Sequence, residues 1–145
     1  MSNGIKYSPE LIDSFEQEHR ELLQSYGRLS LHANAVSYLK FQEEICKFKS
    51  SLVSHLLKEA IKLYIYLRQQ LKSDPASYRL VSSYKSEMDS IGKVAMDFID
   101  KYVGLSSEQV NFEELNAGLR DIGKVLGDRI RREESELYPL YQANY

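Results

Sequence analysis

The sequence predicts an all-α fold, an up-down-up-down four-helix bundle that occupies residues 1–145 as a single domain. Three observations predict it. Apolar residues recur at alternating steps of three and four through four long segments, which is the spacing of helices packed against other helices. The 3 prolines and 7 glycines stand mostly at the edges of those segments. A length of 145 residues suits one domain with a core of its own.

The first two helices are expected at either side of a turn within residues 32–37. The first should begin at Ser8 and Pro9, where serine caps a helix and proline fits the first turn. Its buried stripe is Ile12, Phe15, His19, Leu22, Tyr26 and Leu29. The second helix should cover roughly 36–71. Its buried stripe is Phe41, Ile45, Phe48, Leu52, His55 and Glu59, followed by Lys62 or Leu63 and then by Tyr66.

The third and fourth helices are marked by clear capping residues. Asp74 followed by Pro75 predicts a helix start, and Gly104 suits the C-terminal end of that helix. Its buried stripe is Val81, Tyr84, Met88, Ile91, Ala95, Phe98 and Tyr102. Asn111 with Glu114 three residues later resembles a capping box that opens the fourth helix. The stripe of that helix is Phe112, Leu115, Leu119, Ile122, Leu126, Arg129 and Glu133.

Five of these stripe positions are polar, although the stripe should face the core. They are His19, His55, Glu59, Arg129 and Glu133. At ~1.5 Å per residue, all five lie roughly 14–24 Å from the same end of the predicted bundle, so they should form one layer. A buried charge must be paired or must bind a metal. From the residues alone, a buried ion pair of the glutamates with Arg129 and a metal site both stay open.

Three motifs resemble those of the hemerythrin-like (HHE cation-binding) family. They are EHREL at 18–22, SHLLKE at 54–59 followed by Leu63-Tyr64, and RIRREESELYPLY at 129–141. The resemblance implies a hemerythrin-like four-helix bundle, which in many members holds a non-haem di-iron centre bridged by carboxylates. It also implies that the metal ligands here are His19, His55, Glu59 and Glu133.

The chain departs from that family's pattern at three ligand positions. The third-helix histidine is replaced by Met88, the fourth-helix histidine by Arg129, and the second carboxylate of helix two by Ala60. Thioether sulfur is a poor ligand for hard ferric iron, and an arginine is itself a cation. The remaining ligands match one metal position, so we expect at most one iron or other divalent metal ion.

A second resemblance connects the chain to the Rsd/AlgQ anti-sigma proteins, which are also helical bundles. It depends on LIDSFEQE at 11–18 and LRDIGKVLGDRIRREE at 119–134. This resemblance implies an interaction protein that binds no metal and regulates the transcription machinery through a protein partner.

Composition narrows the class of function. The charges are nearly balanced, with 19 Lys and Arg against 21 Asp and Glu, so neither nucleic acid nor an anionic membrane is an expected partner. Cys46 is the single cysteine, no apolar run reaches ~18 residues, and no secretory signal is visible, so a cytoplasmic protein is expected. We expect a binding or sensing protein rather than an enzyme. An oxidase or peroxidase ranks below the metal-free interaction protein.

Overall fold

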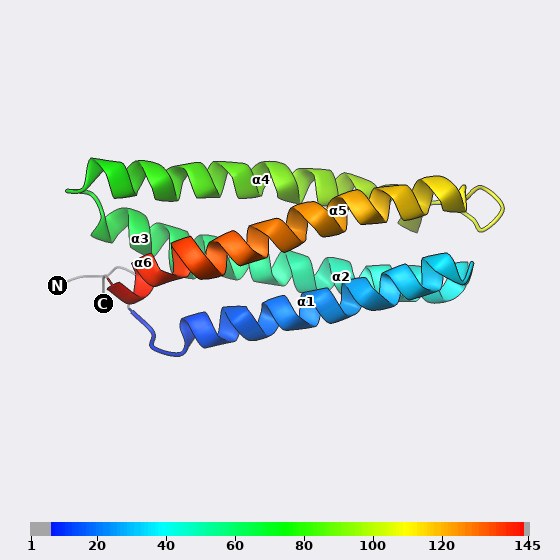
Figure 1. Cartoon of the computed structure of the whole chain (residues 1–145), viewed down its shortest axis with the longest axis horizontal. Helices are drawn as coiled ribbons and strands as arrows, with labels where there is room; N and C mark the ends of the chain where they lie inside the picture. The colour runs from blue at the N-terminus through cyan, green and yellow to red at the C-terminus, as the bar shows by residue number, and fades with distance from the viewer. Residues whose placement is uncertain (1–6, 144–145) are drawn as a thin grey trace.

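The chain folds into four long helical rods, with no strand among residues 7–143, which the computed structural model describes (Figure 1). Residues 1–6 and 144–145 of the predicted domain lie outside this range. Two short π-helices, η1 and η2, continue the α-helices on either side of them without a break. The elements are α1 (Leu11–Asn34), α2 (Tyr38–Glu59), η1 (Ala60–Tyr64), α3 (Ile65–Gln70), α4 (Pro75–Val103), α5 (Phe112–Arg132), η2 (Glu133–Leu137) and α6 (Tyr138–Ala143).

The rods pack as the predicted four-helix bundle. The rod α1 contacts both α2 and α5, and α4 contacts the same two rods from the other side. Figure 1 shows that the start of α1, the turn between α3 and α4, and α6 all lie at one end of the bundle. Residues at equal height above that end therefore face one another across the core.

Helix ends agree with the predicted caps in the second half of the chain. The Asp74 side chain accepts a hydrogen bond from the backbone N–H of Ser77 at 3.3 Å. The Asn111 side chain accepts one from the backbone N–H of Glu114 at 3.1 Å. These bonds satisfy amide groups that lack a partner within the helix.

The predicted starts of the first two helices are wrong by two or three residues. The first begins at Leu11, with Glu10 in the N-cap position, and the Ser8 backbone N–H donates to the Tyr141 hydroxyl at 2.6 Å. The second begins at Tyr38 instead of Val36. Val36 has a φ of 57°, which lies outside the right-handed helical region.

A layer of polar side chains divides the core into two apolar clusters. We call it the polar layer, and it consists of His19, His55, Glu59, Arg129 and Glu133, each at most 3 % exposed. One cluster extends toward the α1–α2 turn and includes Leu22, Leu52 and Leu126. The other extends toward α6 and includes Phe15, Leu63, Tyr84 and Leu137. The polar layer therefore lies deep in the bundle and is supported on both sides.

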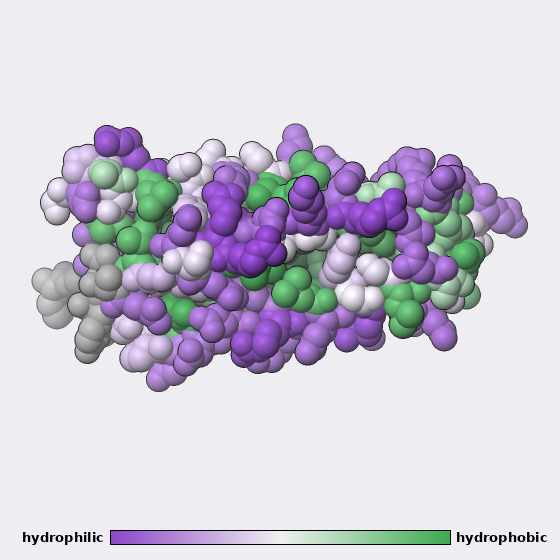
Figure 2. Space-filling view, in the orientation of Figure 1, coloured by the Kyte–Doolittle hydropathy of each residue, from purple (hydrophilic) through white to green (hydrophobic). Residues whose placement is uncertain are grey.

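The outer faces of the rods are mainly hydrophilic. In Figure 2 hydrophobic side chains show as separate areas among hydrophilic ones and do not form a continuous band. Within residues 7–143, no helix combines the length and the apolar character that crossing a membrane requires.

Candidate metal centre

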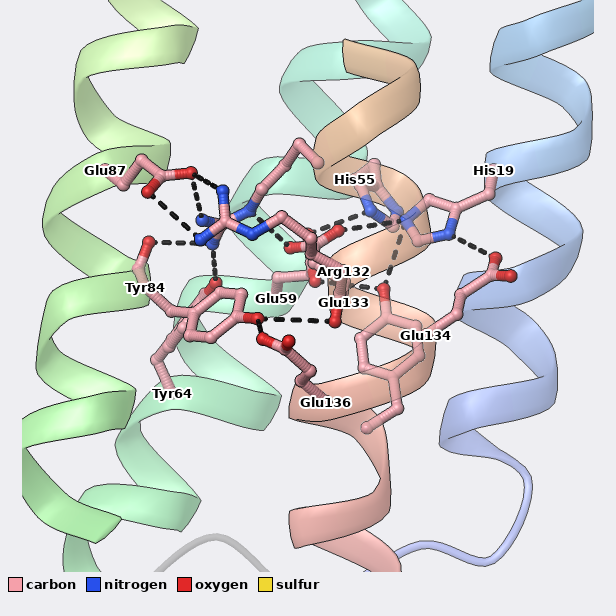
Figure 3. Close-up of polar contacts among 12 residues, drawn as sticks. His19, His55, Glu59, Tyr64, Tyr84, Glu87, Arg132, Glu133, Glu134 and Glu136 are labelled. Carbon is pink, nitrogen blue, oxygen red and sulfur yellow. Dashed lines mark hydrogen bonds and ion pairs between the residues drawn. The ribbon is translucent and has the colours of Figure 1, made fainter. Parts of the chain in front are cut away.

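Three of the four rods place histidine and glutamate side chains at one point in the core. His19 comes from α1, His55 and Glu59 from α2, and Glu133 from the start of η2 (Figure 3). Each offers one ligand atom, and these four atoms all lie within 4.8 Å of one another. The prediction that these side chains converge in one buried layer is confirmed.

The four side chains are only partly satisfied by one another. His55 Nε2 lies 2.9 Å from Glu59 Oε1, and His19 Nε2 lies 3.2 Å from Glu133 Oε1. Among the described side chains, His55 Nε2, Glu59 Oε1 and Glu133 Oε2 are buried without a hydrogen bond of acceptable geometry. Leaving such an atom unsatisfied costs about 1–3 kcal/mol. Several of them at one centre indicate a place built for a further polar group.

The other nitrogen of each histidine contacts a carboxylate. His55 Nδ1 lies 2.6 Å from Glu18 Oε1, and His19 Nδ1 lies 2.8 Å from Glu134 Oε2. Lys58 holds Glu18 in place at 2.7 Å. When Nδ1 donates its hydrogen to a carboxylate, the lone pair on Nε2 points toward the centre, as in metal sites where a carboxylate orients the ligand histidine. This arrangement suits a cation at the centre.

The chemistry of the donor set fits a metal ion. Two imidazole nitrogens and two carboxylates suit iron, manganese or zinc. Ligands about 2.0–2.2 Å from one ion can be at most about 4.4 Å apart. The present cluster would need only a slight contraction to reach that limit. His19, His55, Glu59 and Glu133 are therefore the residues that would hold the ion.

Arg129 lies on the other side of the two carboxylates and is as buried as they are. Its guanidinium donates to the Tyr64 hydroxyl at 2.8 Å and to the Tyr84 backbone carbonyl at 2.7 Å. Its Nη1 pairs with Glu87 at 3.2 Å, and its Nε lies 3.5 Å from Glu133 Oε2. The expected ion pair with Glu133 is thus present. Glu59 instead contacts His55 and the Tyr138 hydroxyl.

Both glutamates of the polar layer stand where the helix widens into a π-turn. Glu59 directly precedes η1, and Glu133 is the first residue of η2. In a π-turn the residue five positions later returns to the same side, so Tyr64 follows Glu59 and Tyr138 follows Glu133 into the core. The apolar spacing predicts a core position for both glutamates but no contact between them and Tyr64 or Tyr138. The repeated spacing Glu-x4-Tyr was the available signal.

The electrostatics of the layer are set by burial and by the pairing of opposite charges. Burial and the charge of Glu59 raise the pKa of Glu133 above its ordinary value. Burial acts in the same direction on Glu59, but the close ion pair with His55 outweighs it, so the pKa of Glu59 is lowered. Burial would lower the pKa of His55, yet Glu59 and Glu18 raise it to about 9. The metal-free layer therefore holds a protonated His55 at neutral pH.

A small cavity adjoins the cluster on the side of the apolar core. Its volume is about 30 Å³, and apolar residues such as Leu22, Leu52 and Leu126 share its wall with the polar layer. A cavity needs at least about 10–15 Å³ to hold one water molecule. The cavity therefore has room for one molecule of the size of water beside the polar layer.

The raised pKa of His55 predicts how the stability of the metal-free protein depends on pH. Charged His55 interacts favourably with Glu59 and Glu18 only when the protein is folded, so this contribution is complete below pH 6.5 and is lost as the pH rises through about 9. We expect the thermal midpoint, measured with a chelator present, to fall between pH 6.5 and 9. His55→Gln should flatten this dependence, whereas His32→Gln should not. A midpoint in the unmodified protein that is constant over this range would contradict the prediction.

Comparison with known proteins agrees with the geometry of the centre. The family model described as the hemerythrin HHE cation-binding domain matches residues 10–141. No match was found among curated proteins or among solved structures. The resemblance to the Rsd/AlgQ anti-sigma proteins receives no support. Because the family match covers nearly the whole chain, including all four residues of the cluster, the protein belongs to the hemerythrin HHE cation-binding domain family.

Proposed function

We propose that this protein is a cytoplasmic binding or sensing domain that holds one non-haem metal ion, iron in the first instance, in its core. One observation carries the proposal: His19, His55, Glu59 and Glu133 bring four buried ligand atoms within 4.8 Å of one another. Family membership supports metal binding as the general role. The partners of the two Nδ1 atoms support it further, because they leave both Nε2 atoms directed at the centre.

The limit of one ion follows from Arg129. A second ion bridged by the same carboxylates would have to lie on the side of Glu133 where the guanidinium already stands. Four neighbouring acceptors and the Tyr84 ring, 4.5 Å from the guanidinium carbon, hold that group in place. A permanent positive charge repels a second cation and compensates the carboxylates without one. Met88, which lines the cavity, offers only a thioether.

A role in binding or sensing is consistent with the position of the ligands. They come from three rods, so the binding or loss of an ion would change the distance between those rods. Bound iron would supply a coordination position for a small molecule from the adjoining cavity. The chain's own residues orient the two imidazoles, compensate the charge and keep bulk water away. We propose no catalytic turnover, because the ligand set for a second ion is missing.

Metal stoichiometry tests the proposal directly. Protein purified without an affinity tag and loaded anaerobically with ferrous iron should retain about one equivalent per chain, since one ligand set is complete. Elemental analysis after desalting gives the number. His55→Ala should reduce retention at least tenfold, whereas the matched change His32→Ala, in the last turn of α1, should leave it unchanged. Two equivalents in the unmodified protein, or none, would contradict a mononuclear centre.

Removing Arg129 tests the compensation of charge. We expect Arg129→Ala to destabilise the metal-free protein by about 3 kcal/mol at neutral pH, the range for breaking a buried pair. The loss should shrink at acid pH, where the glutamates can take up protons instead. Chemical denaturation measures both values. The control is Arg131→Ala, because the side chain of Arg131 is 74 % exposed and should contribute little. An Arg129→Ala variant as stable as this control would refute the charge compensation.

A further inference from the structure

The hydroxyl of Tyr138 lies at the metal centre, beside two of its four ligand residues. It is 3.1 Å from His19 Nε2 and donates to Glu59 Oε2, also at 3.1 Å. The ring is 1 % exposed and stacks on His19, with ring centroids 5.6 Å apart and planes at 13°. Phe15 stacks against the ring of Tyr138 at 5.6 Å. The oxygen is thus held in one place by packing as well as by hydrogen bonds.

Those two distances are the ones expected between neighbouring ligands of one ion. Ligand atoms about 2.0–2.2 Å from a metal lie roughly 3.0–3.5 Å apart when they are adjacent in an octahedral or tetrahedral arrangement. The Tyr138 oxygen is therefore where a fifth ligand atom would stand, next to a histidine nitrogen and a carboxylate oxygen. A residue that only supports a ligand from behind would contact the other nitrogen of the imidazole, as Glu134 does.

The hydroxyl oxygen of Tyr138 can be compared with that of Tyr64 in the same chain. Tyr64 and Tyr138 occupy equivalent positions, each five residues after a buried glutamate and across a π-turn. The Tyr64 oxygen accepts a hydrogen bond from the guanidinium of Arg129 at 2.8 Å, so it faces a fixed cation. The equivalent oxygen of Tyr138 faces the histidine and glutamate cluster. On that side of the layer, a bound metal ion would be the corresponding cation.

We propose that Tyr138 is a fifth protein ligand of this centre, binding a metal ion through its phenolate oxygen. The inference depends on the proposed metal binding and adds to it the class of metal. When the oxygen binds, its bond to hydrogen is replaced by a bond to the metal, the electron pair stays on oxygen, and the proton is released to solvent. An anionic oxygen is a hard ligand, which favours ferric iron over softer ions.

Phenolate bound to ferric iron absorbs visible light through charge transfer from the ring to the metal. Neither carboxylate nor neutral imidazole gives a charge-transfer transition that excites the vibrations of a phenolate ring. The protein should be loaded anaerobically with one equivalent of ferrous iron, oxidised with ferricyanide and desalted. We expect a visible band in the unmodified protein and resonance Raman lines of a phenolate ring when that band is excited. A zinc-loaded sample should show neither.

The deciding variant is Tyr138→Phe, with Tyr64→Phe as its matched control. Tyr138→Phe should retain iron through the other four ligands and lose the band, whereas Tyr64→Phe should keep it. A ferric protein with one iron per chain but without phenolate Raman lines would overturn the ligand proposal and leave the metal centre intact. An unmodified protein that retains no iron would overturn both. If Tyr138→Phe does not fold, the Raman spectrum of the unmodified protein still shows whether a tyrosine oxygen binds the iron.

Discussion

The structure depends on how two carboxylates are compensated in the middle of a helical bundle. Glu59 and Glu133 are each at most 2 % exposed, and a carboxylate removed from water costs several kcal/mol unless positive charge or hydrogen-bond donors replace the lost hydration. Arg129 does this on one side through Glu133. Protonated His55 does it on the other side of the metal-free layer, and the proposed metal ion would replace that charge. The layer is thus asymmetric: one half has a permanent cation, and the other half has a replaceable one.

Because Arg129 occupies one side of the layer, the four candidate ligand residues all belong to one site on the other side. His19, His55, Glu59 and Glu133 have ligand atoms at one centre, and Glu18 and Glu134 direct both imidazoles toward it. The carboxylate at each outer nitrogen fixes the orientation of the ring, so both Nε2 atoms face the same point. The two apolar clusters above and below exclude water and hold the rods in register, so each side chain reaches the centre from a rigid helix.

Much of this arrangement follows from the sequence, and the features that do not follow from it have a physical explanation. The three-four spacing identifies the rods, and the interruptions at His19, His55 and Arg129 identify the layer. Hydrophobic spacing does not show which side chains a partly exposed residue will contact. It therefore does not predict that Glu18, Glu87 and Glu134 contact the polar layer. It does not predict the π-turns either. One extra residue in a turn shifts the helix register, and no particular residue type marks the place where this happens. That insertion is what brings Tyr64 and Tyr138 to the polar layer.

We propose that this layer holds one metal ion on the histidine side and has an arginine on the other. Anomalous X-ray scattering from crystals grown with ferrous iron under anaerobic conditions tests it most directly, because it locates each ion independently of any variant. We predict a single peak among His19, His55, Glu59 and Glu133, with the Arg129 guanidinium still facing Glu133. Two peaks bridged by the glutamates, with Arg129 displaced from the layer, would contradict it.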